Sequence, residues 1–521
     1  MDNITLTLPE ALRRAVSAYE VGRFEEAEQL CQQILAAKSD FFDAIHLLAI
    51  TESSLGKKDK ALASCDRALA LWPDHAEVLS NRGVILLDLK RFEEALASFD
   101  RALAARPDFA QALSNQGNAL HQLNRFEEAL ASLDRALALR PDFAEALSNR
   151  GNTLHEMSRF DEALASLDRA LLAQPDYPEA LFNRGNSLCG LARFDEALAS
   201  YDRALKLRPD YAEAHYHVAL TSLLMGDFDR GWKNYERRWK TEQLRNNKRN
   251  FPQPLWLGSN EIAGKTILLH AEQGFGDTIQ FCRYLPWVAQ RAAQVVLEAP
   301  EPLRDLMATF AGSARIATRG EPLPNFDLHC PLLSLPLAFG TRVNTIPAAT
   351  PYLCVSAPAI KKWNVKLGLR QRPRIGLAWS GRPTHRNDRN RSIELSALLP
   401  ILNFAAEFVS LQRDVRPDDA TILGRSNIMH FGEELNDFSD TAALILNLDL
   451  VISVDTSVAH LAGALAKPVW VLLPFIPDWR WLFDRNDSPW YPTARLFRQD
   501  SGRSWDDVIE HVHSALYNFV T

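Results

Sequence analysis

Residues 72–107 read WPDHAEVLSNRGVILLDLKRFEEALASFDRALAARP, and this stretch decides the fold because its pattern recurs every 34 residues. The interval carries a proline (Pro73, Pro107, Pro141, Pro175, Pro209), an aromatic residue (Phe92, Phe126, Phe160, Phe194, Phe228), an alanine (Ala95, Ala129, Ala163, Ala197) and a glycine (Gly83, Gly117, Gly151, Gly185). A proline cannot continue a helix, and small residues let two helices pack closely. A repeat of this length predicts a helix–turn–helix solenoid.

Alignment on the proline places the two helices of one unit near residues 76–89 and 92–105. The register extends backwards to Arg23-Phe24, so we expect about seven units over residues 1–241, the first two of them degenerate. The quoted stretch resembles a tetratricopeptide repeat. This resemblance implies an all-α solenoid whose groove holds a protein or peptide partner.

The first helix of four successive units carries an asparagine at the same position: Asn81, Asn115, Asn149 and Asn183. Asparagine is a poor helix former, and its amide can both donate to and accept from a peptide backbone. A similar row of asparagines lines the solenoid of O-GlcNAc transferases, which grip protein substrates there. We therefore expect these four residues to bind the acceptor. The alternative is that the amides bond to a neighbouring helix.

Composition excludes several classes of protein. The net charge of −7 disfavours generic nucleic-acid binding through a basic field. Six widely spaced cysteines without a C-x-x-C pair indicate free thiols in a reducing compartment. The N-terminus lacks the pattern of a signal peptide, and no apolar run reaches membrane-spanning length. We therefore expect a cytoplasmic protein.

The composition and the hydrophobic pattern of the sequence change after the repeats. Residues 242–263 are polar and then marked by proline and glycine, which indicates a linker. Beyond them, short apolar runs rich in β-branched residues alternate with helical stretches, which predicts parallel sheets covered by helices. We expect two doubly wound halves, residues 264–355 and 373–521, joined by a linker helix in 356–372. Ligands of such halves bind at the carboxyl ends of the strands, in the cleft between them.

One loop at such a strand end is Glu272-Gln273-Gly274-Phe275-Gly276-Asp277. Its glycines allow a close approach of the backbone to a ligand, and Asp277 stands at the start of the next helix. Aspartate is also a common helix cap. On spacing alone, we favour the cap.

Two further loops lie at strand ends in the last half. Residues 380–392 carry four arginines, which suit phosphate groups but also suit a solvated basic loop. Residues 455–460, DTSVAH, place hydroxyls and free amides at a helix N-terminus. That arrangement serves as a diphosphate site or as an ordinary helix cap.

Together the loops resemble a known family. Residues 264–475 look like the heptosyltransferase-type glycosyltransferases of the GT-B fold, through G-x-G-D with a later proline (Gly274 to Pro286), the arginine loop and DTSVAHLAGALAKP (Asp455 to Pro468). By this resemblance Asp277 is the candidate catalytic base. The residues it implies for binding the donor are Ser380, Arg391, Asp455, Thr456, Ser457 and His460.

A solenoid followed by two Rossmann-like halves has the layout of O-GlcNAc transferases. The resemblances imply an inverting, metal-independent glycosyltransferase that needs no cofactor, uses a nucleotide-sugar donor, and recruits a protein acceptor through its solenoid. Two alternatives stay open. The acceptor could be a glycan or a lipid-linked sugar, with the solenoid serving assembly, or the chain could be an adaptor without catalytic activity.

Overall fold

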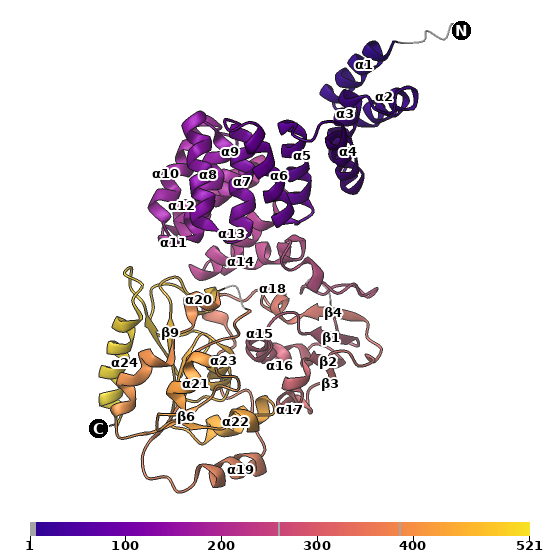
Figure 1. The fold of residues 1–521 in the computed structure, drawn as a ribbon. Helices are drawn as coiled ribbons and strands as arrows, with labels where there is room; N and C mark the ends of the chain where they lie inside the picture. Colours follow the sequence, from indigo (N-terminus) through magenta and orange to yellow (C-terminus); the bar gives the residue numbers. More distant parts are fainter. Residues whose placement is uncertain (1–6, 259–260, 385–386, 521) are drawn as a thin grey trace. The chain divides into compact units, whose positions relative to one another are not determined.

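The structure is a computed structural model that describes residues 7–258, 261–384 and 387–520 (Figure 1). The chain divides into two compact units, Met1–Asp210 and Tyr211–Thr521. Over its described residues the first unit is helical, and every strand of the described chain belongs to the second unit. The expected succession of an α-helical region and an α/β region is therefore confirmed.

The first unit consists of six helical hairpins at the predicted 34-residue interval. Its helices are α1 (Leu8–Glu20), α2 (Phe24–Ala37), α3 (Phe42–Ser54), α4 (Lys58–Leu71), α5 (Ala76–Asp88), α6 (Phe92–Ala105), α7 (Ala110–Gln122), α8 (Phe126–Leu139), α9 (Ala144–Glu156), α10 (Phe160–Ala173), α11 (Pro178–Gly190) and α12 (Phe194–Leu207). A seventh hairpin, α13 (Ala212–Leu224) and α14 (Phe228–Tyr235), keeps the register but belongs to the second unit. These fourteen helices confirm the predicted solenoid of about seven units.

Within a hairpin, a glycine of the first helix packs against a large side chain of the second. A Cβ atom on Gly83 would lie 2.5 Å from the ring of Phe99, and one on Gly117 would lie 2.6 Å from Cγ of Leu133. No side chain fits at such distances without displacing its neighbour. The prediction that these glycines let the two helices approach closely is confirmed.

The turn inside every hairpin has one residue in the left-handed conformation. The position is occupied by Gly22, Gly56, Lys90, Asn124, Ser158, Ala192 and Gly226, with φ between 58° and 84°. A residue with a Cβ atom adopts this conformation at a cost of about 1–2 kcal/mol, which glycine avoids. The sequence pattern does not predict this turn, because four of the seven units carry another residue there.

The second unit contains two sheets in which every pair of neighbouring strands is parallel. The first sheet contains β1 (Thr266–His270), β2 (Gln294–Ala299), β3 (Arg315–Thr318) and β4 (Leu328–Pro331). The second contains β5 (Arg374–Ala378), β6 (Glu407–Ser410), β7 (Met429–His430), β8 (Leu450–Val454), β9 (Val469–Leu473) and β10 (Ala494–Arg498). The helices are α15 (Phe275–Phe281), α16 (Leu285–Ala289), α17 (Arg304–Met307), α18 (Leu335–Ala338), α19 (Ala357–Leu367), α20 (Asp388–Arg391), α21 (Pro417–Leu423), α22 (Phe438–Leu446), α23 (Ser457–Ala464) and α24 (Trp505–Val520).

The strand order places a switch point in each sheet. The first sheet has the order β3-β2-β1-β4, and the second has β10-β9-β8-β5-β6-β7. In each, the chain first builds outward on one side of its first strand and then crosses to the other side. Ligands of open parallel sheets bind at the carboxyl ends of the strands beside this point. The loops after β1 and β4, and those after β5 and β8, therefore carry the candidate sites.

The seventh hairpin is built into the α/β region of the second unit. The indole of Trp232 donates a hydrogen bond to the backbone oxygen of Thr341, 3.0 Å away, and its ring lies edge-on to Trp479 at 5.2 Å. The ring of Phe228 stacks on Trp490 at a centroid distance of 6.2 Å. All three aromatic side chains that α14 contributes to this packing, Phe228, Trp232 and Tyr235, are buried. The last repeat therefore contacts the segment after β4 of the first sheet and the segment between β9 and β10 of the second.

Candidate functional site

The loop after β1 presents Asp277 at the beginning of α15. Gly274 is the N-cap of this helix, and its backbone N–H donates to Oδ2 of Asp277 over 2.7 Å. Asp277 thus serves as a cap from the third position of the helix. Its side chain remains 17% exposed, so a ligand can still reach the carboxylate.

The loop after β5 carries Ser380 and Arg391. Ser380 is buried, and its hydroxyl accepts a hydrogen bond of 2.9 Å from the side chain of Gln412. Arg391 donates through Nη1 to the backbone oxygen of Asp455 over 2.9 Å, and its Nε lies 3.9 Å from a carboxylate oxygen of Asp388, with no hydrogen-bond partner among the described residues. His385 and Arg386 of the predicted arginine loop lie outside the described residues.

Arg416, which sequence reasoning missed, supports the same loop. Its Nη2 donates to the carboxylate of Asp388 and, over 3.1 Å, to the hydroxyl of Ser392. Its Nε is also buried without a partner in the described part of the chain. These bonds hold Arg416 against the loop that carries Ser380 and Arg391.

The loop after β8 leads into α23. Thr456 is the N-cap of this helix and Ser457 its first residue, and both are half-buried. The carboxylate of Asp455 lies 3.9 Å from Nε2 of His460. The predicted donor-binding residues of the second sheet are therefore neighbours, because the loops after β5 and β8 flank the switch point.

Burial sets the charge state of two of these side chains. Burial, and then the negative charge of Asp478, raise the pKa of Asp455 to about 6, against the opposing charges of Arg391 and Arg480. Burial and nearby arginines hold the pKa of His460 well below its usual range. His460 is therefore a neutral imidazole at physiological pH. It is also held in place: Nδ1 is 3.0 Å from the hydroxyl of Tyr491.

The two sheets meet where α15 packs on α23. A Cβ atom on Gly276 would lie 2.9 Å from Cδ2 of His460, so this glycine permits the contact. Next to it, Arg480 forms ion pairs with Asp277 and with Asp478, the second at 2.8 Å. Asp277 is thereby brought to the predicted donor-binding residues of the second sheet.

Sequence reasoning also missed Arg480, although it lies between two tryptophans that the motif Pro-Asp-Trp-Arg-Trp makes conspicuous. A charged residue flanked by large aromatics after a buried strand was the available signal. The neighbouring ring of Trp481 stacks on His460 at 5.3 Å with an interplanar angle of 17°. This tryptophan therefore packs inside the site.

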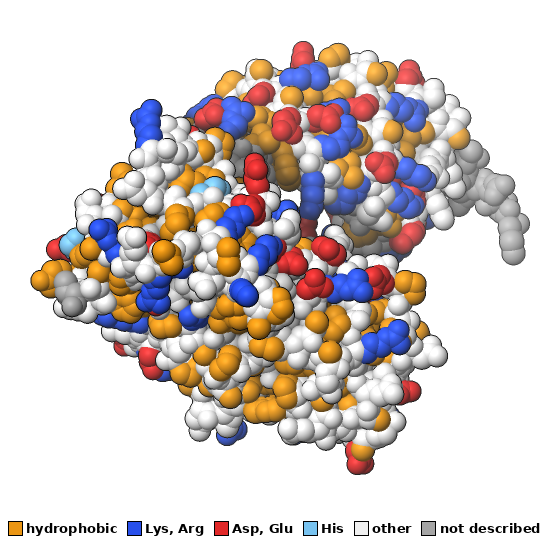
Figure 2. Space-filling view, turned by 90° about the horizontal axis from the view of Figure 1, so that it is seen from below, with side chains coloured by type: hydrophobic (Ala, Val, Ile, Leu, Met, Phe, Trp, Pro, Cys, Tyr) orange, Lys and Arg blue, Asp and Glu red, His pale blue; other side chains and the backbone are white. Residues whose placement is uncertain are grey.

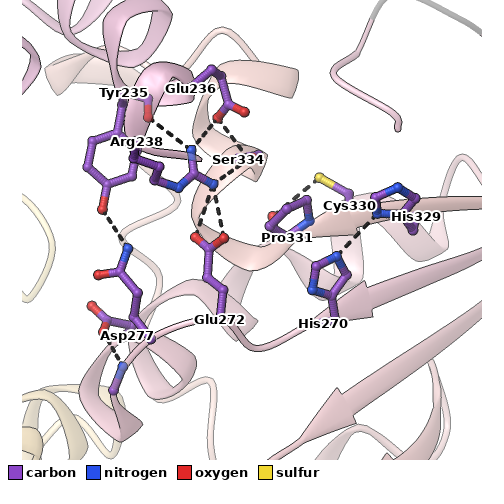
Figure 3. A network of polar contacts seen from close by, with 12 residues as sticks. Tyr235, Glu236, Arg238, His270, Glu272, Asp277, His329, Cys330, Pro331 and Ser334 are labelled. Carbon is purple, nitrogen blue, oxygen red and sulfur yellow. Dashed lines mark hydrogen bonds and ion pairs between the residues drawn. The ribbon is translucent and has the colours of Figure 1, made fainter. Parts of the chain in front are cut away.

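The seventh hairpin and the 3-10 helix Glu236–Lys240 that follows it are bonded to the loop that carries Asp277 (Figure 3). Nη2 of Arg238 lies 3.0 Å from both carboxylate oxygens of Glu272, and the two side chains are 0% and 1% exposed. Gln273 donates to the hydroxyl of Tyr235 over 3.0 Å. Burial raises the pKa of Glu272 to about 7 in spite of the opposing charge of Arg238. Both residues before the Gly274 turn are thus held by the last repeat.

The four asparagines of the predicted ladder lie in the first unit. The amide nitrogen of Asn149 is 3.4 Å from the hydroxyl of Ser114, and that of Asn183 is 3.5 Å from Ser148, each partner belonging to the preceding repeat. Asn81 lies 2.9 Å from Nε2 of His46. Asn115 is buried, and the other three asparagines are half-buried. Three of the four amides therefore contact the preceding repeat while keeping some surface exposed.

Three further observations concern the surface charge, groups that could bind a metal ion, and helices that could cross a membrane. On the face drawn in Figure 2, basic and acidic side chains are interspersed over the described residues. Within the described ranges, no three or more His, Cys, Asp and Glu side chains group in a way that could hold a metal ion. Among the helices formed by those residues, none is long and apolar enough to cross a membrane.

Comparison with family models identifies the repeats. A "TPR repeat" model matches residues 117–158, and two "Tetratricopeptide repeat" models match residues 46–110 with 182–239 and residues 142–210. Tetratricopeptide repeats are present over the N-terminal half. The match over residues 182–239 includes the seventh hairpin, so the repeat family extends into the second compact unit.

Known proteins resemble this chain over part of its length. Protein FlbA of Caulobacter vibrioides is 26% identical over 293 residues, which cover 51% of this chain and 49% of that protein. The chain therefore spans about half the length of this curated relative. Among solved structures, YrrB, described as a TPR protein with an unusual peptide-binding site, is 25% identical and covers 35% of this chain and 95% of its own, with a TM-score of 0.29. PilW, a type IV pilus biogenesis factor, is 24% identical, with coverage of 39% and 97% and a TM-score of 0.36.

Proposed function

We propose that the second unit is a GT-B glycosyltransferase that moves a sugar from a nucleotide-diphosphate donor to an acceptor hydroxyl. The observation that carries the proposal is the meeting of two switch points. Asp277 comes from the first sheet, Arg391 and His460 come from the second, and the Arg480 ion pair and the contact of Gly276 with His460 join them. Two parallel sheets that present such groups to each other suit a donor on one side and an acceptor on the other.

The donor diphosphate fits beside Arg391 and the start of α23. The side chains of Arg391 and Arg416 are 15% and 34% exposed and can present their positive charge to a phosphate, and the N-terminus of α23 adds the dipole of a helix. Thr456 and Ser457 contribute hydroxyls to the same place. These groups would stabilise the charge that develops on the nucleoside diphosphate as it leaves.

On the acceptor side, Asp277 acts as the general base. The acceptor oxygen attacks the anomeric carbon, the bond from that carbon to the diphosphate oxygen breaks, and the hydroxyl proton passes to the Asp277 carboxylate. The nucleoside diphosphate leaves with the electron pair of the broken bond. Attack opposite the leaving group inverts the anomeric configuration, and the base contributes about a hundredfold or more to the rate.

The solenoid would recruit a protein acceptor in this scheme. Each half-buried asparagine of the first unit can offer its remaining amide groups to an extended backbone. We place the reaction in the cytoplasm, where the six free cysteines would stay reduced.

One observation favours a second candidate. The amides of Asn149 and Asn183 already contact the preceding repeat. If their role is only structural, they do not bind a protein acceptor. The acceptor would then be a glycan or a lipid-linked sugar, and the solenoid would serve assembly.

The test is Asp277→Asn in the full chain. We expect transfer to fall about a hundredfold or more while nucleoside diphosphate binding, measured by calorimetry, stays unchanged. Glu10→Gln is a matched control, since Glu10 accepts from the backbone N–H of Thr7 at the same capping position of α1. Near-normal transfer by the Asp277→Asn protein would show that Asp277 only caps α15 and is not the base.

A further inference from the structure

Arg480 lies between two carboxylates that come from different halves of the second unit. Asp277 lies in the first turn of α15, which follows β1 of the first sheet, whereas Asp478 precedes the short 3-10 helix Trp479–Trp481 after β9 of the second sheet. Nη2 of Arg480 donates to Oδ1 of Asp277, and Nη1 donates to Oδ1 of Asp478 over 2.8 Å. One guanidinium therefore serves both carboxylates.

The surroundings of Arg480 make this arrangement specific. The side chain is 9% exposed, and its guanidinium carbon lies 4.3 Å from the ring centroid of Trp479. Its Nε is buried without a partner among the described residues. A buried arginine without an anion is costly, so the side chain depends on its two carboxylates.

Both oxygens of the Asp277 carboxylate are held by different parts of the molecule. Oδ2 accepts from the backbone N–H of Gly274, which fixes it to the turn of its own helix. Oδ1 accepts from Arg480, which belongs to the other half. The direction in which Asp277 offers its basic lone pairs therefore depends on Arg480.

We propose that Arg480 is the positioning residue for Asp277: it orients the carboxylate toward the acceptor and keeps it ionised through an ion pair made from the opposite half. This inference rests on the proposed function of Asp277 as the base. The other titratable groups whose charges act on Asp277 or on Arg480 come from several elements. They are Asp478, Asp455, Glu272, Tyr216 of α13, Tyr235 of α14 and His460 of α23.

The signs of these charges predict what removal of Arg480 does. A cation beside a carboxylate favours the ionised form, and its loss makes the carboxylate easier to protonate. Asp478 adds negative charge, which acts in the same direction once Arg480 is gone. The acid limb of the pH–rate profile should therefore move to higher pH in Arg480→Met. Removal of the Asp478 charge should leave the limb in place or move it lower, because Arg480 then serves Asp277 alone.

The experiment compares Arg480→Met, Arg480→Lys and Asp478→Asn with the wild type in the full chain. The first readout is the pH–rate profile of transfer. The second is a titration of 13C-labelled aspartate carboxyls by NMR, in which Asp277→Asn identifies the Asp277 signal, and this readout needs no turnover. In Arg480→Met we expect both midpoints to rise by about one pH unit or more, as for loss of an adjacent opposite charge.

Arg480→Lys keeps the charge but not the two-pronged geometry. It should return the acid limb to its wild-type position while turnover stays several-fold below normal. An Arg480→Met protein with unmoved midpoints would overturn the proposal. If Arg480→Met fails to fold, the other two variants decide. A midpoint of the Asp277 titration that rises by one pH unit in Asp478→Asn or in Arg480→Lys would then overturn the proposal. A wild type that transfers no sugar would count against the proposed function alone, because the NMR titration would still decide whether Arg480 governs Asp277.

Discussion

Gly276→Ala tests whether α15 rests on His460 as described. The new Cβ atom would lie 2.9 Å from Cδ2 of His460, whereas ordinary contact begins at 3.4 Å, so a gap of about 0.5 Å must open. His460 cannot turn away without losing its hydrogen bond to Tyr491 and its stacking on Trp481. The helix that carries Asp277 must therefore move instead.

The magnitude follows from two opposing terms. Overpacking costs about 1–3 kcal/mol, and alanine in place of a helical glycine regains about 0.5–1 kcal/mol. The difference lies between about 0 and 2.5 kcal/mol, and a net loss near the middle of this range, about 1 kcal/mol, should lower the melting temperature by roughly 2–4 °C. Because a misplacement of about 1 Å costs on the order of a hundredfold in rate, a shift of about half that size should slow transfer roughly tenfold.

The assay is turnover of the nucleotide sugar together with a thermal melt of the same sample. Gly312→Ala is the control, because a Cβ atom on Gly312 meets nothing within 4 Å. It should leave both readouts at their wild-type values. If Gly276→Ala also left both unchanged, the contact between α15 and His460 would not be the one described, and the meeting of the two switch points would lose its support.

Three further predictions concern the donor site and the solenoid. Asp455→Asn should raise the melting temperature at pH 8 and change it little at pH 4: burial raises the pKa of Asp455 to about 6, so its ionised form costs stability above pH 6 and that cost disappears as the pH falls. Equal shifts at both pH values in scanning fluorimetry would contradict this. Arg391→Ala should weaken nucleoside diphosphate binding about tenfold in calorimetry, and EDTA should not alter wild-type transfer; loss on chelation that Mn²⁺ restores would refute the metal-independent scheme. Replacing Asn81, Asn115, Asn149 and Asn183 together by Ala should leave the solenoid helical by circular dichroism, and should weaken transfer to a protein acceptor up to about a thousandfold, at about 1 kcal/mol for each lost hydrogen bond. Donor hydrolysis should not change. If the wild type and the quadruple variant transferred sugar to a protein acceptor equally well, the asparagines would have only a structural role.

The solenoid could be predicted from the sequence because its contacts are local and repeated. Gly83 meets Phe99 only 16 positions away, and the same contact recurs in the next three units at Gly117, Gly151 and Gly185. The parallel sheets follow from the alternation of apolar runs and helices, and the loops at strand ends follow from the same alternation. Local pattern was therefore enough to place Asp277, Arg391 and Asp455 at the ends of strands.

Contacts between distant segments could not be predicted in this way. Asp277 and Arg480 are 203 positions apart, and a pattern within one loop carries no information about its partner in another. The ion pair of Arg238 with Glu272 joins the segment after the last repeat helix to the loop after β1. Neither the 34-residue repeat nor the alternation of strands and helices predicts this contact. The repeat pattern continues through the seventh hairpin, and only packing against Trp479 and Trp490 shows that this hairpin belongs with the sheets.

The most direct test of the central claim is turnover of a panel of nucleotide sugars by the purified full-length protein. Release of nucleoside diphosphate is measured with and without a protein acceptor, in wild type and in Asp277→Asn. The account predicts release from at least one donor, stimulated by the acceptor and reduced about a hundredfold or more in the variant. A wild-type protein that neither binds nor cleaves any donor of the panel would contradict it and leave an adaptor built of tetratricopeptide repeats.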